Sequence, residues 1–290
     1  MTTATDKPAT THLRSTDLRG ASRLAVAATL GLTDLVEHLH HNITQAPWPL
    51  GTPIDGPTRG VTGLVYRSIR GVTRLVGGSL DALLSQAEWL LGPDSGVASP
   101  EREAVVSALN GVMGDRLAAA GNPLAITMGL HLDGQPLALA PSALAQRGPA
   151  LRSKVLVMVH GLCMGPSQWR RNGHDHGRAL AEAGGFTPLY LHYNTGRHVA
   201  DNGLALAELL QALHGNWPVP IDELVILAHS MGGLVARSAC HQANVRGDSW
   251  PKALRRMVFL GTPHHGAPLA RGGQWIDTAL GASPYTAAFA

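Results

Sequence analysis

Apolar residues recur at helical spacing through the first 120 residues, and short continuous apolar runs replace them further along the chain. The clearest helical pattern covers residues 58–91, where Val and Leu at three- and four-residue steps form one face. The opposite face is charged and carries Arg67, Arg70, Arg74, Asp81 and Glu88. Weaker patterns at 15–41 and 100–120 predict two further helices, one on each side of it.

The pattern changes near residue 123. Asp133-Gly134 is a hairpin signal between two short strand candidates. Beyond it, apolar runs alternate with helical patterns, and the runs lie at 155–159, 187–193, 224–227 and 257–260. Continuous apolar strands that alternate with helices are typical of a parallel sheet covered on both faces. We therefore predict a fold of the α/β class, with a polar disordered tail at 1–15, a helical region at 16–122 and an α/β core at 123–290.

Composition narrows the classes of function. The net charge is only +3 and no dense Lys/Arg block is present, so no nucleic-acid partner is expected. Two cysteines, Cys163 and Cys240, are too few for a disulfide scaffold. The polar N-terminus lacks the pattern of a secretory signal, and no run of about 18 apolar residues occurs. These features predict a cytoplasmic protein.

The segment ELVILAHSMGGLVARSA predicts a strand, a tight turn and a helix, with Ser230 in the turn. In a nucleophile elbow the strand and the helix approach so closely that the positions two before and two after the serine must be small, and here they are Ala228 and Gly232. Such a turn exposes the hydroxyl at the carboxyl end of the sheet. Ser230 is therefore the candidate nucleophile, and the N–H of Met231 a candidate oxyanion donor. His229 is expected to pack in the elbow.

A second motif, KVLVMVHGLCMG, ends an earlier strand at His160-Gly161. The other oxyanion donor of an elbow enzyme comes from the loop after an early strand on the same side of the sheet. The N–H of Leu162, just past Gly161, is the candidate. Because the elbow and this loop occur together, chance is a poor explanation for either.

These motifs resemble the α/β-hydrolase superfamily over roughly residues 125–285. VHGLCMG resembles its oxyanion loop, AHSMGG resembles the elbow of small bacterial lipases, and LGTPHHGAPLA at 260–270 resembles a segment of lipases and GPI inositol-deacylase-like hydrolases. The resemblance implies hydrolysis of a small-molecule or lipid ester through an acyl-enzyme on Ser230, with a His as base. It implies no metal and no organic cofactor.

The acid and the base of a triad are not in their expected places. The chain order in this fold is Ser, then Asp or Glu, then His. Only 29 residues follow Gly261, and they contain no strand-like run, so we expect a core that is incomplete at its C-terminus. His264 and His265 are the remaining candidates for the base, and neither matches the family pattern. An esterase and a non-catalytic hydrolase-fold chain are thus both open readings.

Two other features have plain explanations. His174-Asp175-His176 lacks a third metal ligand at a recognisable spacing and is read as the polar start of a helix, so no metal site is predicted. Residues 58–91 could pack on the core or lie on an anionic membrane, and we favour packing. In the non-catalytic reading, this helical region would bind a membrane or a partner.

Overall fold

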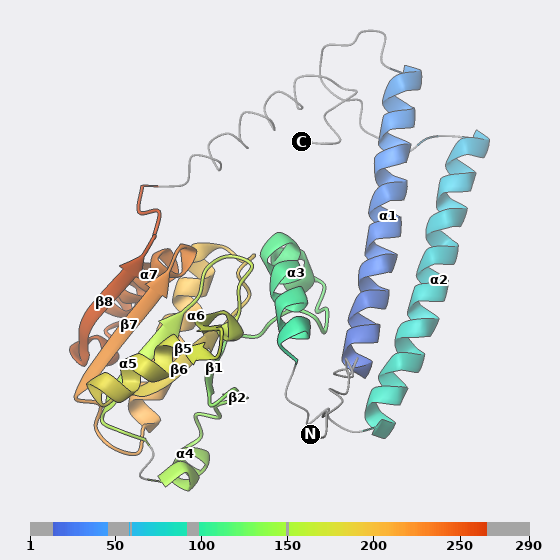
Figure 1. The fold of residues 1–290 in the computed structure, drawn as a ribbon. Coiled ribbons are helices and arrows are strands. Elements are labelled where there is room, and N and C mark those ends of the chain that lie inside the picture. The colour runs from blue at the N-terminus through green and yellow to red at the C-terminus, as the bar shows by residue number, and fades with distance from the viewer. Residues whose placement is uncertain (1–13, 46–57, 59, 92–98, 149–150, 266–290) are drawn as a thin grey trace, which may run out of the picture. The chain divides into compact units, whose positions relative to one another are not determined.

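The computed structural model describes residues 14–45, 58, 60–91, 99–148 and 151–265 (Figure 1). The chain divides into two compact units, which are described one at a time. Among the described residues, the first, called the sheet unit, comprises 99–148 and 151–264. The second, called the hairpin unit, comprises 14–45, 58, 60–91 and 265.

The sheet unit is built on one sheet in the order β2-β1-β6-β3-β7-β8. The last four strands in that order are parallel, whereas β1 runs antiparallel to both of its neighbours. The strands are β1 Gly129–Leu132, β2 Gln135–Pro136, β3 Lys154–Val159, β6 Thr187–His192, β7 Glu223–His229 and β8 Leu254–Leu260. The prediction of a mixed α/β fold with a mostly parallel sheet is confirmed.

Helices cover both faces of this sheet. α6 (Val199–Asn216) and α7 (Met231–Arg246) supply Leu206, Leu210 and Val235 to the larger core, together with Val155, Val157 and Ile226 of the sheet. The opposite face carries the alternate residues Leu156, Met158 and Leu227, on the side of α5 (His176–Gly184). Smaller elements complete the unit: α3 Pro100–Ala119, α4 Pro141–Arg147 and a short hairpin of β4 Arg170–Arg171 with β5 His174–Asp175.

The connections after β3 and β7 leave the sheet in opposite directions. From β3 the chain passes through α5 to β6 on one side, and from β7 it passes through α7 to β8 on the other. β3 and β7 are neighbours, with Val159 paired to Ala228 at their carboxyl ends. Such a reversal is where open α/β sheets form a crevice for ligands. The residues that follow these two strands are His160-Gly161-Leu162 and Ser230.

The hairpin unit contains two long antiparallel helices, α1 (Ser15–Gln45) and α2 (Gly60–Leu91). Arg19 near the start of α1 pairs with Asp81 of α2, and Asp34 further along α1 pairs with Arg70. A Cβ atom on Gly77 would lie 2.5 Å from Val26, so the two helices approach closely there. None of the described helices combines the length and the apolar character needed to cross a membrane.

Candidate active site

Ser230 occupies a strained turn between β7 and α7. Its φ of 52° lies in the left-handed region, which non-glycine residues rarely adopt, and its ψ is −126°. The Ser230 N–H donates to the carbonyl of Leu260, 2.8 Å away, so the conformation is held by the neighbouring strand β8. A residue kept in such a region marks a place where the fold overrides local preference, as at many functional sites.

Small residues around Ser230 allow the close approach that this turn requires. A Cβ atom on Gly232 would lie 2.5 Å from the carbonyl oxygen of His160, which forbids a larger residue there. Ala228, on the other side of the serine, is fully buried. Met231 is the first residue of α7, so its N–H has no partner within the helix.

The loop after β3 lies directly against the turn. A Cβ atom on Gly161 would come within 3.0 Å of the Ser230 Cβ and 3.2 Å of the His229 Nδ1. The next residue, Leu162, is half exposed, and Cys163 has a φ of 59°. The Cys163 N–H donates to the Thr195 hydroxyl at 3.1 Å, which fixes the second strained residue of the site. Sequence reasoning placed these two segments together, and the structure does so.

Helix α3 packs against the outer side of the same loop. The sequence did not predict this contact. A Cβ atom on Gly111 would lie 2.2 Å from the Cys163 Sγ and 2.9 Å from its Cα. The Glu103 carboxylate accepts the N–H of Ser167 at 2.7 Å, at the far end of the loop. The buried Asn194 donates through Nδ2 to the carbonyl of Gly114 at 2.8 Å, beside the non-helical Met113.

His160 is a buried structural residue. Its ring stacks on Tyr193 with 4.5 Å between centroids, and the Tyr193 hydroxyl donates to the His160 carbonyl at 2.8 Å. Burial lowers the pKa of His160 to about 4, so the ring is neutral near pH 7. His192 lies 6.4 Å away between ring centroids, and burial together with the nearby His131 lowers its pKa to about 3. No spacing in the sequence predicts that His131, His160 and His192 lie near one another.

Within the described residues, His264 forms no hydrogen bond to the Ser230 hydroxyl. The Nδ1 of His264 lies 2.9 Å from the guanidinium of Arg237, which can only donate. The His264 Nδ1 therefore accepts this hydrogen bond. His265 is the last described residue and belongs to the hairpin unit. His229 packs edge-on against Trp169, as expected of an elbow residue.

A pocket of about 500 Å³ lies beside the turn on the face of the sheet that α5 partly covers. His160 and His229, which immediately precede Gly161 and Ser230, both line it. The remaining lining is mainly apolar and includes Trp169, Leu180, Leu227, Val258 and Leu260. Asp175, at the start of α5, accepts the N–H of Arg178 at 2.9 Å and so caps the helix, in agreement with the reading of His174-Asp175-His176 as a polar helix start.

The fold places this chain among the mixed α/β proteins with a mostly parallel sheet and a serine in the turn after a central strand. Within that class, it belongs to the family described as a domain of unknown function (DUF7379), whose model matches residues 135–280, half of the sequence. No curated protein matches the sequence.

Two solved structures of a Bacillus licheniformis lipase, BlEst2, are similar to part of the chain. The propeptide form is 26% identical over 46% of this chain and 28% of the lipase chain, and the mature form is 25% identical over 48% and 54%. Both superpositions have a TM-score of 0.35. The chain thus spans between about a quarter and about half the length of the lipase chains that it matches.

Proposed function

We propose that this protein is a serine hydrolase of the α/β-hydrolase type that cleaves carboxylic esters through an acyl-enzyme on Ser230. The observation that carries the proposal is the strained Ser230 at the reversal point of the sheet, with Gly161 packed against its Cβ. Strain at an ordinary turn would be relieved by glycine, whereas a nucleophile must keep its side chain.

The chemistry follows from the two segments that meet there. The Ser230 hydroxyl attacks the ester carbonyl, and the negative charge that develops on the oxygen is stabilised by the N–H groups of Met231 and Leu162. Departure of the alcohol leaves the acyl-enzyme, which water then hydrolyses. The hydroxyl proton must pass to a base, and His264 and His265 are the first residues to test in that role.

The substrate is expected to carry an apolar acyl group. The pocket beside Ser230 has the size of a small-ligand site, and its walls are mainly aliphatic and aromatic. A lipid ester or a small-molecule ester would both fit this description, and no organic cofactor or metal is needed for either.

Labelling with a serine-directed fluorophosphonate tests the assignment of the nucleophile. The full chain should be labelled, and Ser230→Ala should abolish labelling because the attacking oxygen is gone. Ser249→Ala, a serine bonded to Gln211 away from the site, should label as the wild type does. Labelling that persists in Ser230→Ala, or a wild-type chain that never reacts, would remove Ser230 from this role.

A second candidate function is a non-catalytic chain that retains the hydrolase fold and binds a partner through its helices. The observation that favours it is the lack of a histidine bonded to the Ser230 hydroxyl within residues 99–148 and 151–264. Turnover of p-nitrophenyl butyrate discriminates the two. An esterase shows turnover that depends on Ser230. We expect this turnover to be slow, because backbone donors without a full triad retain a rate enhancement of only about 10³–10⁴-fold over the reaction in water.

A further inference from the structure

The helix with the strongest apolar pattern shows that face to solvent within the hairpin unit. Eight large aliphatic residues of α2 are between 40% and 71% exposed: Leu64, Val65, Ile69, Val72, Leu75, Val76, Leu80 and Leu83. Single exposed aliphatic residues are ordinary, but a continuous row of this length marks an interaction surface.

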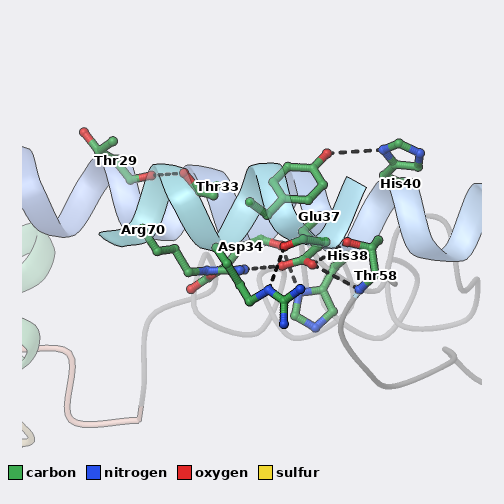
Figure 2. Close-up of polar contacts among 11 residues, drawn as sticks. Thr29, Thr33, Asp34, Glu37, His38, His40, Thr58 and Arg70 are labelled. Carbon is green, nitrogen blue, oxygen red and sulfur yellow. Dashed lines mark hydrogen bonds and ion pairs between the residues drawn. The ribbon is translucent and has the colours of Figure 1, made fainter. Parts of the chain in front are cut away.

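The contact between α1 and α2 is polar instead (Figure 2). Arg70 of α2 pairs with Asp34 at 2.7 Å and with the buried Glu37, which also accepts the Thr58 hydroxyl at 2.6 Å. Nearer the other end, Asp81 accepts from Arg19 at 2.9 Å and from Arg23 at 2.5 Å. Two members of the charged face of α2, Arg70 and Asp81, thus lie against α1.

Six of the eight exposed aliphatic residues of α2 turn toward one side of the hairpin, together with a row on α1, whereas Leu64 and Leu75 point away from α1. On α2, Ile69 and Val76 each precede a residue that faces α1, namely Arg70 and Gly77. The same offset applies on α1, where Val36 precedes Glu37. Each residue rotates the helix by 100°, so a residue that precedes an inward-facing one points to one side of the hairpin. Because the two helices are antiparallel, this rotation points the rows of α1 and α2 to the same side. On α1 the exposed row consists of Leu18, Ala21, Ala25, Ala28, Leu32 and Val36.

The other side of the hairpin is polar. The same geometry turns Arg67 and Arg74 of α2 and His38 of α1 away from the two aliphatic rows. All three side chains are exposed. The hairpin is therefore amphipathic as a pair, with an apolar side defined by the two rows above.

We propose that the apolar side is the interface with a second copy of this chain, in which two hairpins pack as a four-helix bundle. The α2 row follows the four- and three-residue steps of a heptad repeat through Val65, Ile69, Val72 and Val76 to Leu83, with Ser79 at its one polar position. Helices with this period bury the row against other helices of the same kind.

The size of the apolar side suits a dimer. Helices of 31 and 32 residues are about 45 Å long and lie about 9 Å apart, so the side measures roughly 800 Å². One partner of a standard interface contributes about 800 Å². Because the surface is the same on both copies, a two-fold axis closes the assembly and leaves no apolar row exposed.

Charge argues against a lipid surface as the occupant. The two helices together carry five Arg, no Lys and five Asp or Glu, so the hairpin has no net charge to attract anionic headgroups. Three of those arginines, Arg19, Arg23 and Arg70, are already paired with carboxylates inside the hairpin.

Light scattering coupled to size exclusion tests this with the full chain at micromolar concentration. The wild type should have twice its monomer mass of 30.4 kDa. Val72→Glu with Val76→Glu should give the monomer, because charge would be buried at the centre of the row. The matched control is Arg74→Glu with Gly78→Glu on the polar side of the same helical turns, and it should stay dimeric.

A milder pair keeps the test independent of folding. Val72→Ala with Val76→Ala raises helix propensity, yet it should weaken the dimer by about tenfold or more because aliphatic area is lost from the interface. A monomeric wild type would overturn the proposal. This holds whether the monomer sediments with lipid vesicles or buries its apolar side against other residues of its own chain. A dimer that withstands both pairs would also overturn it, because the interface would then lie elsewhere.

Discussion

At the scale of single residues, Gly111 provides the sharpest test of how the site is held. Gly111→Ala should favour α3 by about 0.5–1 kcal/mol through helix propensity alone. The new Cβ would nevertheless meet the backbone of Cys163 at 2.9 Å and displace the loop that carries Leu162. We expect the rate of fluorophosphonate labelling at Ser230 to fall about tenfold or more while the thermal midpoint is kept.

Gly215→Ala is the matched control for this prediction. Gly215 also lies in a helix, and a Cβ there meets nothing within 4 Å. It should leave labelling unchanged. Equal labelling rates for Gly111→Ala and the wild type would show that α3 does not position the loop.

Sequence and structure agree at Ser230 for a local reason. A strand, a small residue, the serine, a glycine and a helix follow one another within about ten positions, so the turn could be predicted from neighbours alone. The support of the loop could not, because Asn194 and Gly114 are separated by 80 positions. Nothing in the pattern around Gly111 or Glu103 points to a loop more than 50 residues further along.

At the scale of elements, Asp81 should make the hairpin sensitive to acid. Hydrogen bonds from Arg23 and Arg19 hold the pKa of Asp81 below its usual range. A depressed folded pKa adds stability above the unfolded value near 4, and that stability is lost as the pH falls further. Asp81→Asn should therefore cost about 1 kcal/mol at pH 7, since the partners are partly exposed, and this cost should shrink as the pH falls below about 4 toward the folded pKa.

Hydrogen exchange of α1 and α2 peptides measures this effect without interference from the sheet unit. Asp222→Asn, an exposed change of the same charge in the sheet unit, is the control and should leave α1 and α2 unaltered. An Asp81→Asn chain with wild-type protection of both helices at neutral pH would contradict the assignment.

The sequence patterns predicted where helices and strands lie along the chain, but they did not predict which face of a helix is buried. The predicted helices at 15–41 and 58–91 correspond to α1 and α2, and the four apolar runs correspond to β3, β6, β7 and β8. Periodicity shows that α2 has an apolar face but not which way it points. Ion pairs hold Arg70 and Asp81 against α1, and they depend on residues of α1 about 36 and 60 positions away. The short α4 and the β4–β5 hairpin carry too few apolar residues to be seen.

At the scale of the whole molecule, the two units should respond to acid in a fixed order. His160 and His192 have folded pKa values of about 4 and about 3, below their ordinary value of 6.5. The unfolded chain therefore binds protons first, and the sheet unit loses stability as the pH falls from 6.5 toward 4, by about 1.4 kcal/mol for each unit of pKa difference. The carboxylates of the hairpin unit lose their contribution only below about pH 4.

Exchange measurements at pH 7, 5 and 3, corrected for the intrinsic rate, would reveal this order. Peptides of β3, β6 and β7 should lose protection before those of α1 and α2. His192→Gln should flatten the profile of the sheet unit, because the buried ring that resists protonation is removed. Loss of the hairpin first would show that the buried histidines do not govern the acid response.

The packing of α3 against the loop after β3 restricts how the sequences of related chains can diverge. Gly111 and Gly114 lie upstream of residues 135–280, the part that matches the family, yet they contact Cys163 and Asn194 within it. A larger residue at position 111 requires a different path for the loop, and a different side chain at position 194 leaves a carbonyl of α3 without its donor. These pairs of positions should drift together among relatives. The set of residues that must change together at the site therefore extends beyond residues 135–280, the segment that matches the family.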